Sequence, residues 1–168
     1  MNPRIILIGG VPGTGKTTLA KAISTNLNIT LLNKDNLEAT LVEKGISSID
    51  NLNGIGYALM ERITLSELTL GRSVILDCVA SRQRVDEHWE PLKNKDIKYI
   101  ECICSNSTLH RTRLESRERN MRGWYELTWD DVKKIAKSYE PCFTKRLVID
   151  STKQLKKNLE KALEYVSS

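Results

Sequence analysis

Two hydrophobic periodicities alternate along the chain, and together they predict strands that are separated by helices. Continuous apolar runs are typical of strands that are covered on both faces. The runs that predict strands lie at residues 4–8, 29–32, 73–76, 97–104 and 147–149. Between them, apolar residues recur at every third or fourth position, as they do along the buried face of a helix. These helical segments lie near residues 16–27, 36–44, 53–70, 82–94, 107–120, 128–140 and 155–166.

Strands that alternate with helices predict crossover connections, and crossovers make the strands of one sheet parallel. The chain has 168 residues, an ordinary size for one domain, and it contains no internal repeat, low-complexity segment or linker. We therefore expect a single domain over residues 1–168. Its predicted fold is a three-layer α/β fold, with a five-stranded parallel sheet flanked by helices.

A glycine-rich run, Gly10-Val11-Pro12-Gly13-Thr14-Gly15-Lys16-Thr17, lies between the first predicted strand and the first predicted helix. Glycines there let backbone N–H groups turn inward around phosphate oxygens, and the helix directs its positive end to the same place. In this P-loop pattern the lysine reaches the β- and γ-phosphates and the threonine hydroxyl coordinates Mg²⁺. We expect the P-loop NTPase form of the fold, with ATP and Mg²⁺ as cofactors. The predicted binding residues here are Gly10, Gly13, Thr14, Gly15, Lys16, Thr17 and Thr18.

Two other nucleotide-binding patterns do not match. A dinucleotide-binding turn requires Gly-x-Gly-x-x-Gly, and after Gly13 and Gly15 the third position is Thr18. A GTPase of the Ras type would carry Asn-Lys-x-Asp late in the chain. The similar run 33–36 ends in asparagine instead and lies early, so a guanine-specific site is not expected.

Two aspartates follow predicted strands, at the edge where parallel sheets bind ligands. Asp77 follows the third strand and could hold Mg²⁺ or its water shell; the alternative is a helix N-cap or a loop-orienting acid. Asp35 follows the second strand and could accept the proton of an attacking hydroxyl; the alternative is that it caps the next helix. The sequence favours the metal role for Asp77 and the base role for Asp35.

Arginines crowd residues 111–122, where only Glu115 and Glu118 oppose them. We interpret Arg111 and Arg119 as part of a solvated helix face with i,i+4 pairs. The helical pattern is lost from Asn120 to Tyr125, which predicts a lid at about residues 117–127. Because arginines on a closing lid stabilise charge on a transferring phosphoryl group, the candidate catalytic arginines are Arg117 first, then Arg122 and Arg113.

Composition changes this picture little. The net charge of +5 suits an anionic ligand such as ATP or a nucleic-acid end, and equally a solvated surface. Cys102 and Cys104 alternate within a predicted strand and are expected in the core, and no metal site with Cys78, Cys142 or the histidines is expected. The chain has no signal peptide and no apolar run near the roughly 20 residues that span a bilayer. We expect a cytoplasmic protein without membrane contact.

The order of these features resembles the small P-loop kinases of the nucleoside-monophosphate-kinase type, and within them the AAA_33-like group. The resemblance covers nearly the whole chain. It rests on the P-loop, Asp35, Asp77, the arginine-rich segment and the run Tyr139-Glu140-Pro141 before the last strand. Polynucleotide 5′-kinases, zeta toxins, chloramphenicol phosphotransferase and gluconate kinases are relatives within this group.

The resemblance implies roles for individual residues. Asp35 corresponds to the hydroxyl-activating base and Asp77 to the acid of the magnesium shell. Arg117 matches the lid arginine, and Ser151 and Thr152 lie where such kinases begin the loop that contacts adenine. The expected activity is transfer of the γ-phosphate of ATP to a hydroxyl of a small molecule or nucleotide.

The chain also departs from individual relatives, which leaves the acceptor open. Polynucleotide end-kinases carry Asp-x-x-Arg after the second strand, and here the last position is Glu38. Gluconate kinases carry Gly-Asp followed by a histidine, whereas here Lys34 precedes Asp35 and no histidine follows. A nucleic-acid 5′-end kinase is therefore possible but not favoured. A nucleotide-dependent switch without an acceptor is the other alternative.

Overall fold

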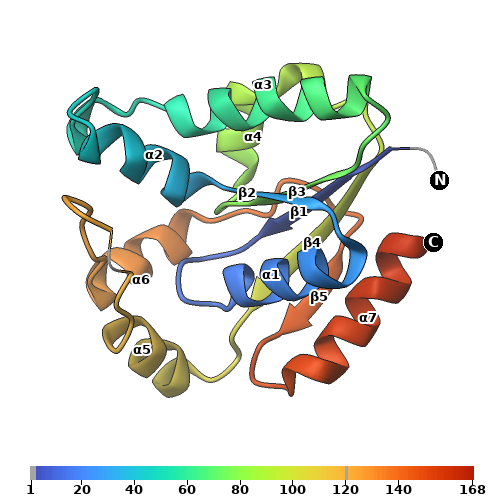
Figure 1. The fold of residues 1–168 in the computed structure, drawn as a ribbon. Helices are drawn as coiled ribbons and strands as arrows, with labels where there is room; N and C mark the ends of the chain where they lie inside the picture. Colours follow the sequence, from blue (N-terminus) through green and yellow to red (C-terminus); the bar gives the residue numbers. More distant parts are fainter. Residues whose placement is uncertain (1–2, 120) are drawn as a thin grey trace.

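The computed structural model describes residues 3–119 and 121–168, and they alternate between strands and helices (Figure 1). The strands are β1 (Ile5–Gly9), β2 (Thr30–Asn33), β3 (Val74–Asp77), β4 (Ile97–Ile103) and β5 (Leu147–Asp150). The α-helices are α1 (Lys16–Leu27), α2 (Lys34–Glu43), α3 (Ile55–Thr69), α4 (Arg82–His88), α5 (Ser107–Glu115), α6 (Trp129–Ser138) and α7 (Leu155–Ser167). Two short 3₁₀ helices lie at Ile49–Asn51 and Glu90–Leu92. The five predicted strands are confirmed.

The strands form one parallel sheet in the order β2-β3-β1-β4-β5. Strand β1 is central, and all five of its residues are buried, as its continuous apolar run predicts. Strand order reverses at β1, since the chain continues to one side of it with β3 and β2 and to the other with β4 and β5. Ligands of open α/β sheets bind at such a point, outside the carboxyl ends of the strands.

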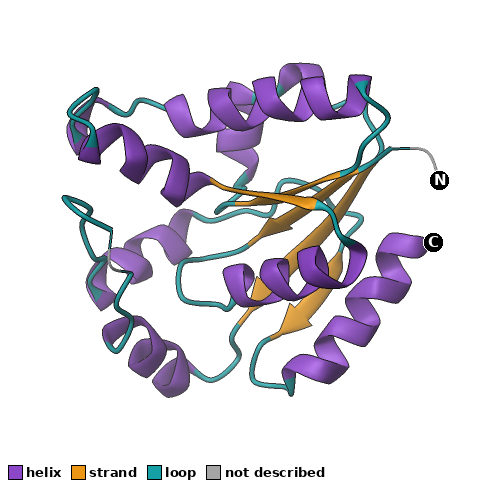
Figure 2. Cartoon of the chain, in the orientation of Figure 1, coloured by secondary structure: helices purple, strands orange, loops and turns teal. Residues whose placement is uncertain are grey.

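Helices cover both faces of the sheet, and each face buries its own apolar cluster (Figure 2). Successive side chains of a strand point to opposite faces. Ile5 and Leu7 therefore pack into the cluster under α3 and α4, and Ile6 and Ile8 pack into the cluster under α1 and α7. The predicted three-layer α/β fold is confirmed.

Two helices are shorter than the periodicity predicts. The segment expected over 82–94 stops at His88 and continues as a 3₁₀ turn that contains Pro91, because proline cannot donate to the preceding helical turn. The segment expected over about 107–120 ends at Glu115, and residues 116–127 that the structure describes have no helix or strand. Within this segment Arg119 forms ion pairs with the distant Asp35 and with Glu126.

Three of the four cysteines lie in the core. Cys78, Cys102 and Cys142 are buried free thiols, and burial raises the pKa of Cys102 to about 12. Cys104 lies beyond the end of β4 and is partly exposed, so its interpretation as a strand core residue is wrong. Within the ranges that the structure describes, the helices are too short or too polar to cross a bilayer.

Candidate active site

The P-loop adopts a backbone that only glycine accommodates. Gly10, Gly13 and Gly15 have φ angles of 135°, 85° and 88°, in the region that disfavours side chains. A Cβ on Gly10 would lie 2.2 Å from the carbonyl oxygen of Cys102. Helix α1 begins at Lys16, and none of the described side chains caps its first turn. The N–H groups of that turn therefore remain free to bind an anion.

Lys16 and Thr14 fix the inside of the loop. The Lys16 Nζ donates to the carbonyl oxygen of Val11 at 3.0 Å, and the buried Thr14 hydroxyl donates to the same oxygen at 2.8 Å. Lys16 also lines the cavity described below, together with Thr17 and Thr18. The arrangement holds one ammonium group at the mouth of the loop, where phosphate oxygens would need it.

A buried histidine that sequence reasoning missed contacts the loop from α5. The His110 Nε2 lies 2.7 Å from the Pro12 carbonyl oxygen, so this nitrogen carries the hydrogen and donates. The His110 ring packs edge-to-face on Trp129 of α6, with ring centres 5.0 Å apart. A Cβ on Gly13 would lie 3.0 Å from the same imidazole. Helix α5 thus contacts the P-loop through His110, and α6 packs on His110 through Trp129.

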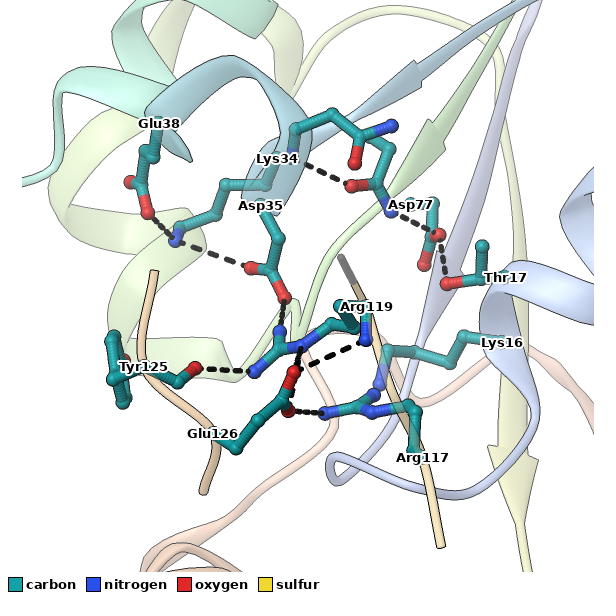
Figure 3. A network of polar contacts seen from close by, with 12 residues as sticks. Lys16, Thr17, Lys34, Asp35, Glu38, Asp77, Arg117, Arg119, Tyr125 and Glu126 are labelled. Carbon is teal, nitrogen blue, oxygen red and sulfur yellow. Dashed lines mark hydrogen bonds and ion pairs between the residues drawn. The ribbon is translucent and has the colours of Figure 1, made fainter. Parts of the chain in front are cut away.

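Asp77 lies at the end of β3 and is buried, with 2 % of its surface exposed. One oxygen, Oδ2, accepts hydrogen bonds from the Thr17 hydroxyl and the Asn33 amide, each at 2.6 Å (Figure 3). Burial raises the pKa of Asp77, whereas the charge of Lys16 and these two hydrogen bonds act in the opposite direction. Helix α4 has its N-cap at Ser81, so Asp77 is not a helix cap.

The Thr17 hydroxyl and the Asp77 carboxylate form a set of hard oxygen donors beside the P-loop. Mg²⁺ prefers such oxygen ligands and often keeps several waters, so one hydroxyl and one carboxylate suit it. The residues therefore fit the magnesium position that the P-loop pattern predicts. Asn33, which sequence reasoning missed in this role, orients the carboxylate.

Asp35 occupies the first turn of α2, and its carboxylate is 44 % exposed. The N-cap of α2 is Asn33, whose side-chain oxygen accepts from the Asn36 N–H at 2.9 Å. The interpretation of Asp35 as the helix cap is therefore wrong. Its Oδ2 accepts from Arg119 at 2.8 Å, and its Oδ1 lies 4.0 Å from the Lys34 ammonium.

Two arginines of the segment after α5 differ sharply in their partners (Figure 3). Arg119 is held by ion pairs to Asp35 and Glu126, and only 13 % of its side chain is exposed. Its interpretation as a solvated helix residue is wrong. Arg117 lies 3.7 Å from Glu126, but its Nε and Nη2 atoms are buried without a hydrogen-bond partner among the described residues. Burial and the charge of Arg119 lower the pKa of Arg117.

The remaining predicted arginines lie elsewhere. Arg113 donates to the hydroxyl of Ser151 at 2.9 Å and to its carbonyl oxygen at 3.2 Å, so it belongs with the loop after β5 rather than with Arg117. Thr152 follows in that loop and donates its N–H to Asp150. Arg122 is exposed, and it is not among the described residues that line the cavity. Arg111 forms the expected exposed i,i+4 pair with Glu115.

A cavity of about 850 Å³ joins these groups at the carboxyl edge of the sheet. Its lining comes from the P-loop, the start of α2, the segment after α5 and the loop after β5. The candidate residues that line it are Gly13, Gly15, Lys16, Thr17, Thr18, Asp35, Arg113, Arg117 and Ser151. The structure thus brings the P-loop, the Asp35 carboxylate and the half-buried Arg117 to one cavity.

Comparison with known families gives one match over most of the chain. The AAA_33 model, described as an AAA domain, matches residues 5–142. The matched range contains the P-loop, Asp35, Asp77 and the arginine-rich segment. No protein with a curated description matches the chain.

Several solved structures share the fold at low sequence identity. A sugar kinase from Janibacter sp. HTCC2649 has a TM-score of 0.70 and 16% identity, covering 99% of this chain and 95% of that one. A gluconokinase from Sinorhizobium meliloti 1021 also has a TM-score of 0.70, with 17% identity and coverages of 98% and 92%. The Mycobacterium tuberculosis APS kinase in complex with AMPPNP and APS has a TM-score of 0.60 and 15% identity, and each chain is 99% covered.

Proposed function

The chain belongs to the AAA_33 family of AAA domains, and we propose that it is an ATP-dependent phosphotransferase that moves the γ-phosphate to a hydroxyl. The acceptor is a small molecule or a nucleotide. The observation that carries this proposal is that Asp35 and Arg117 line the same cavity as Lys16 and Thr17 of the P-loop. Kinases of similar fold, among them a gluconokinase and an APS kinase in complex with AMPPNP, support it. We place the activity in the cytoplasm.

The part of the cavity that the P-loop lines binds the triphosphate. Backbone N–H groups of the loop and of the first turn of α1 surround the phosphates, and Lys16 neutralises the β- and γ-groups. Thr17 and Asp77 would hold Mg²⁺, which supplies positive charge to the phosphates when bound. The base and sugar extend toward Ser151 and Thr152, where the Arg113 guanidinium lines the cavity.

The transfer itself needs a proton acceptor for the attacking hydroxyl and a cation for the charge on the γ-phosphate. Asp35 takes the proton of the acceptor hydroxyl while the hydroxyl oxygen bonds to the γ-phosphorus. The bond between the γ-phosphorus and the β–γ bridging oxygen breaks, and its electron pair stays on ADP. Arg117 balances the charge that spreads over the phosphoryl oxygens. Its Nε and Nη2 atoms suit this task, because they are buried without a hydrogen-bond partner among the described residues and an anion would satisfy them.

The experiment that tests the proposal is a screen for the acceptor. Purified protein is incubated with Mg²⁺ and γ-labelled ATP, with pooled sugars, polyols, nucleosides, antibiotics and oligonucleotides. Label in a phosphate ester, absent with Lys16→Ala, is the expected result. Label in oligonucleotides alone would identify a nucleic-acid end kinase. Label in inorganic phosphate alone, with every pool, would instead indicate a nucleotide-dependent switch.

A further inference from the structure

Only 13 % of the Arg119 side chain is exposed, and each nitrogen of its guanidinium donates a hydrogen bond. Its Nη1 donates to Asp35 at 2.8 Å, its Nε to Glu126 at 3.0 Å, and its Nη2 to the carbonyl oxygen of Tyr125 at 2.9 Å. The guanidinium is planar and rigid, so fixing the Nε and Nη2 donors also fixes the direction of Nη1. Tyr125 and Glu126 therefore aim Arg119 at Asp35.

The two arginines that Glu126 contacts differ in how many of their nitrogens have hydrogen-bond partners. Each nitrogen of Arg119 already donates a hydrogen bond, whereas Nε and Nη2 of Arg117 are buried without a hydrogen-bond partner among the described residues. Glu126 lies between them, bonded to Arg119 and 3.7 Å from Arg117. Two carboxylates, Asp35 and Glu126, thus face two guanidinium groups, so charge in the cluster is balanced before a nucleotide enters.

The Asp35 carboxylate is oriented as a result. Arg119 binds Oδ2, whereas Oδ1 accepts no hydrogen bond from the described residues and lies 4.0 Å from the Lys34 ammonium. Lys34 is itself paired with Glu38 at 2.5 Å, so its charge is already neutralised. One carboxylate oxygen is anchored and the other is free to receive a proton.

We propose that Arg119 is a positioning residue: held by Glu126 and the Tyr125 carbonyl, it orients Asp35 so that Oδ1 accepts the proton of the acceptor hydroxyl. The inference rests on the proposed function, because it assigns a role in that reaction. The segment after α5 would then contribute to both partners of the reaction, the phosphoryl group and the base. Arg117 serves the phosphoryl group, and Arg119 serves the base.

The test compares Arg119→Leu and Arg119→Lys with Arg111→Leu, an exposed arginine whose ion pair is with Glu115. Hydrogen exchange is measured first, because it needs no acceptor. Arg119→Leu should speed exchange in peptides covering residues 34–38 and 121–127, and Arg111→Leu should leave both unchanged. Unchanged exchange at residues 34–38 in Arg119→Leu would overturn the inference.

Kinetics with the acceptor found in the screen then separate positioning from general stability. Arg119→Leu should lower kcat about 10- to 100-fold, the scale of an ångström-sized misplacement, with the KM for ATP within about twofold of wild type. Lysine should rescue poorly, and added guanidinium, far below denaturing concentration, should restore part of the kcat of Arg119→Leu. Wild-type kcat in Arg119→Leu would overturn the inference while the proposed function stands. A wild-type protein that phosphorylates no acceptor would overturn the proposed function, and with it this role.

Discussion

Replacement of Asp77 by asparagine should separate the stability of the protein from its response to Mg²⁺-ATP. Both buried hydrogen bonds of Asp77, from Thr17 and Asn33, end on the same oxygen, and the amide oxygen of asparagine can accept both. The variant loses the charge assistance of these bonds, roughly 1 kcal/mol each, and also loses the cost of a buried charge. These effects oppose each other, so the free energy of unfolding without ligand should change by no more than about 1 kcal/mol.

The response to ligand should change far more. At 100 times its Kd, Mg²⁺-ATP stabilises a protein by about 2.7 kcal/mol, which for a domain of this size raises Tm by about 5–11 °C. Even loss of a residue that only orients a metal ligand lowers metal affinity about 10- to 100-fold, so loss of the Asp77 carboxylate should lower it by at least as much. A 100-fold loss leaves about 0.4 kcal/mol, or about 1–2 °C, at the same ligand concentration.

Thermal unfolding of wild type and Asp77→Asn, with ATP and either Mg²⁺ or a chelator, measures this difference. Asp86→Asn is the matched control, because Asp86 is exposed and pairs only with Lys93 among the described residues. The two proteins should behave alike with ATP and chelator, and differ with Mg²⁺. An Asp77→Asn variant with the full Mg²⁺-dependent rise in Tm would refute the assignment of Asp77 to the metal site.

The pH dependence of stability provides a second test of the buried charge. Burial raises the pKa of Asp77 in the folded protein above its ordinary value of 3.8. At pH values between the unfolded and the folded pKa, Asp77 binds more protons in the folded state than in the unfolded state. The stability that protonated Asp77 contributes is therefore lost as pH rises through this window. Relative to wild type, Asp77→Asn should therefore gain stability from below pH 3.8 to above the folded pKa. A stability difference that does not vary with pH would contradict the direction of this shift.

The remaining predictions concern the other groups of the cavity. Lys16→Ala should keep the fold, seen as an unchanged circular dichroism spectrum, and lower turnover about 10²- to 10³-fold; near-normal phosphotransfer would remove the P-loop from the active site. Asp35→Asn should keep ATP affinity in a titration and lose product formation, and normal turnover would refute its role as base. Arg117→Ala should lower kcat more than it raises KM, with poor rescue by lysine; equal kcat in all three proteins would contradict its role. Gly13→Ala should weaken ATP binding and destabilise the protein by about 1–3 kcal/mol, because its φ of 85° disfavours a side chain and a Cβ would crowd the His110 ring; an unchanged Tm and Kd would contradict this strain.

The fold and the P-loop could be predicted from the sequence because both depend on local patterns. The apolar run from Ile5 to Ile8 is buried throughout, and the helix after the loop begins at Lys16 as the pattern requires. Asp35 and Asp77 could be found because each ends or follows a strand at the carboxyl edge of the sheet. Their positions follow from topology alone, whereas their contacts do not.

The contacts that complete the site are long-range, and local patterns cannot report them. Arg119 lies four residues after Glu115, which resembles a helical ion pair, but its partner Asp35 is 84 residues away. His110 donates to Pro12 across 98 residues, and nothing in its neighbourhood in sequence indicates this. The Asn33 cap did have a local signal, since its side chain binds Asn36 three positions later, as N-cap residues do.

The fate of the γ-phosphate tests the central claim most directly. Wild type and Asp35→Asn are incubated with Mg²⁺, γ-labelled ATP and the acceptor, and label is divided between phosphate ester and inorganic phosphate. Wild type should place the label in the ester, and Asp35→Asn should lose the ester while Mg²⁺-ATP still raises its Tm. Label that reaches only inorganic phosphate in both proteins would contradict the account, because water would then be the acceptor and Asp35 would have no part in the transfer.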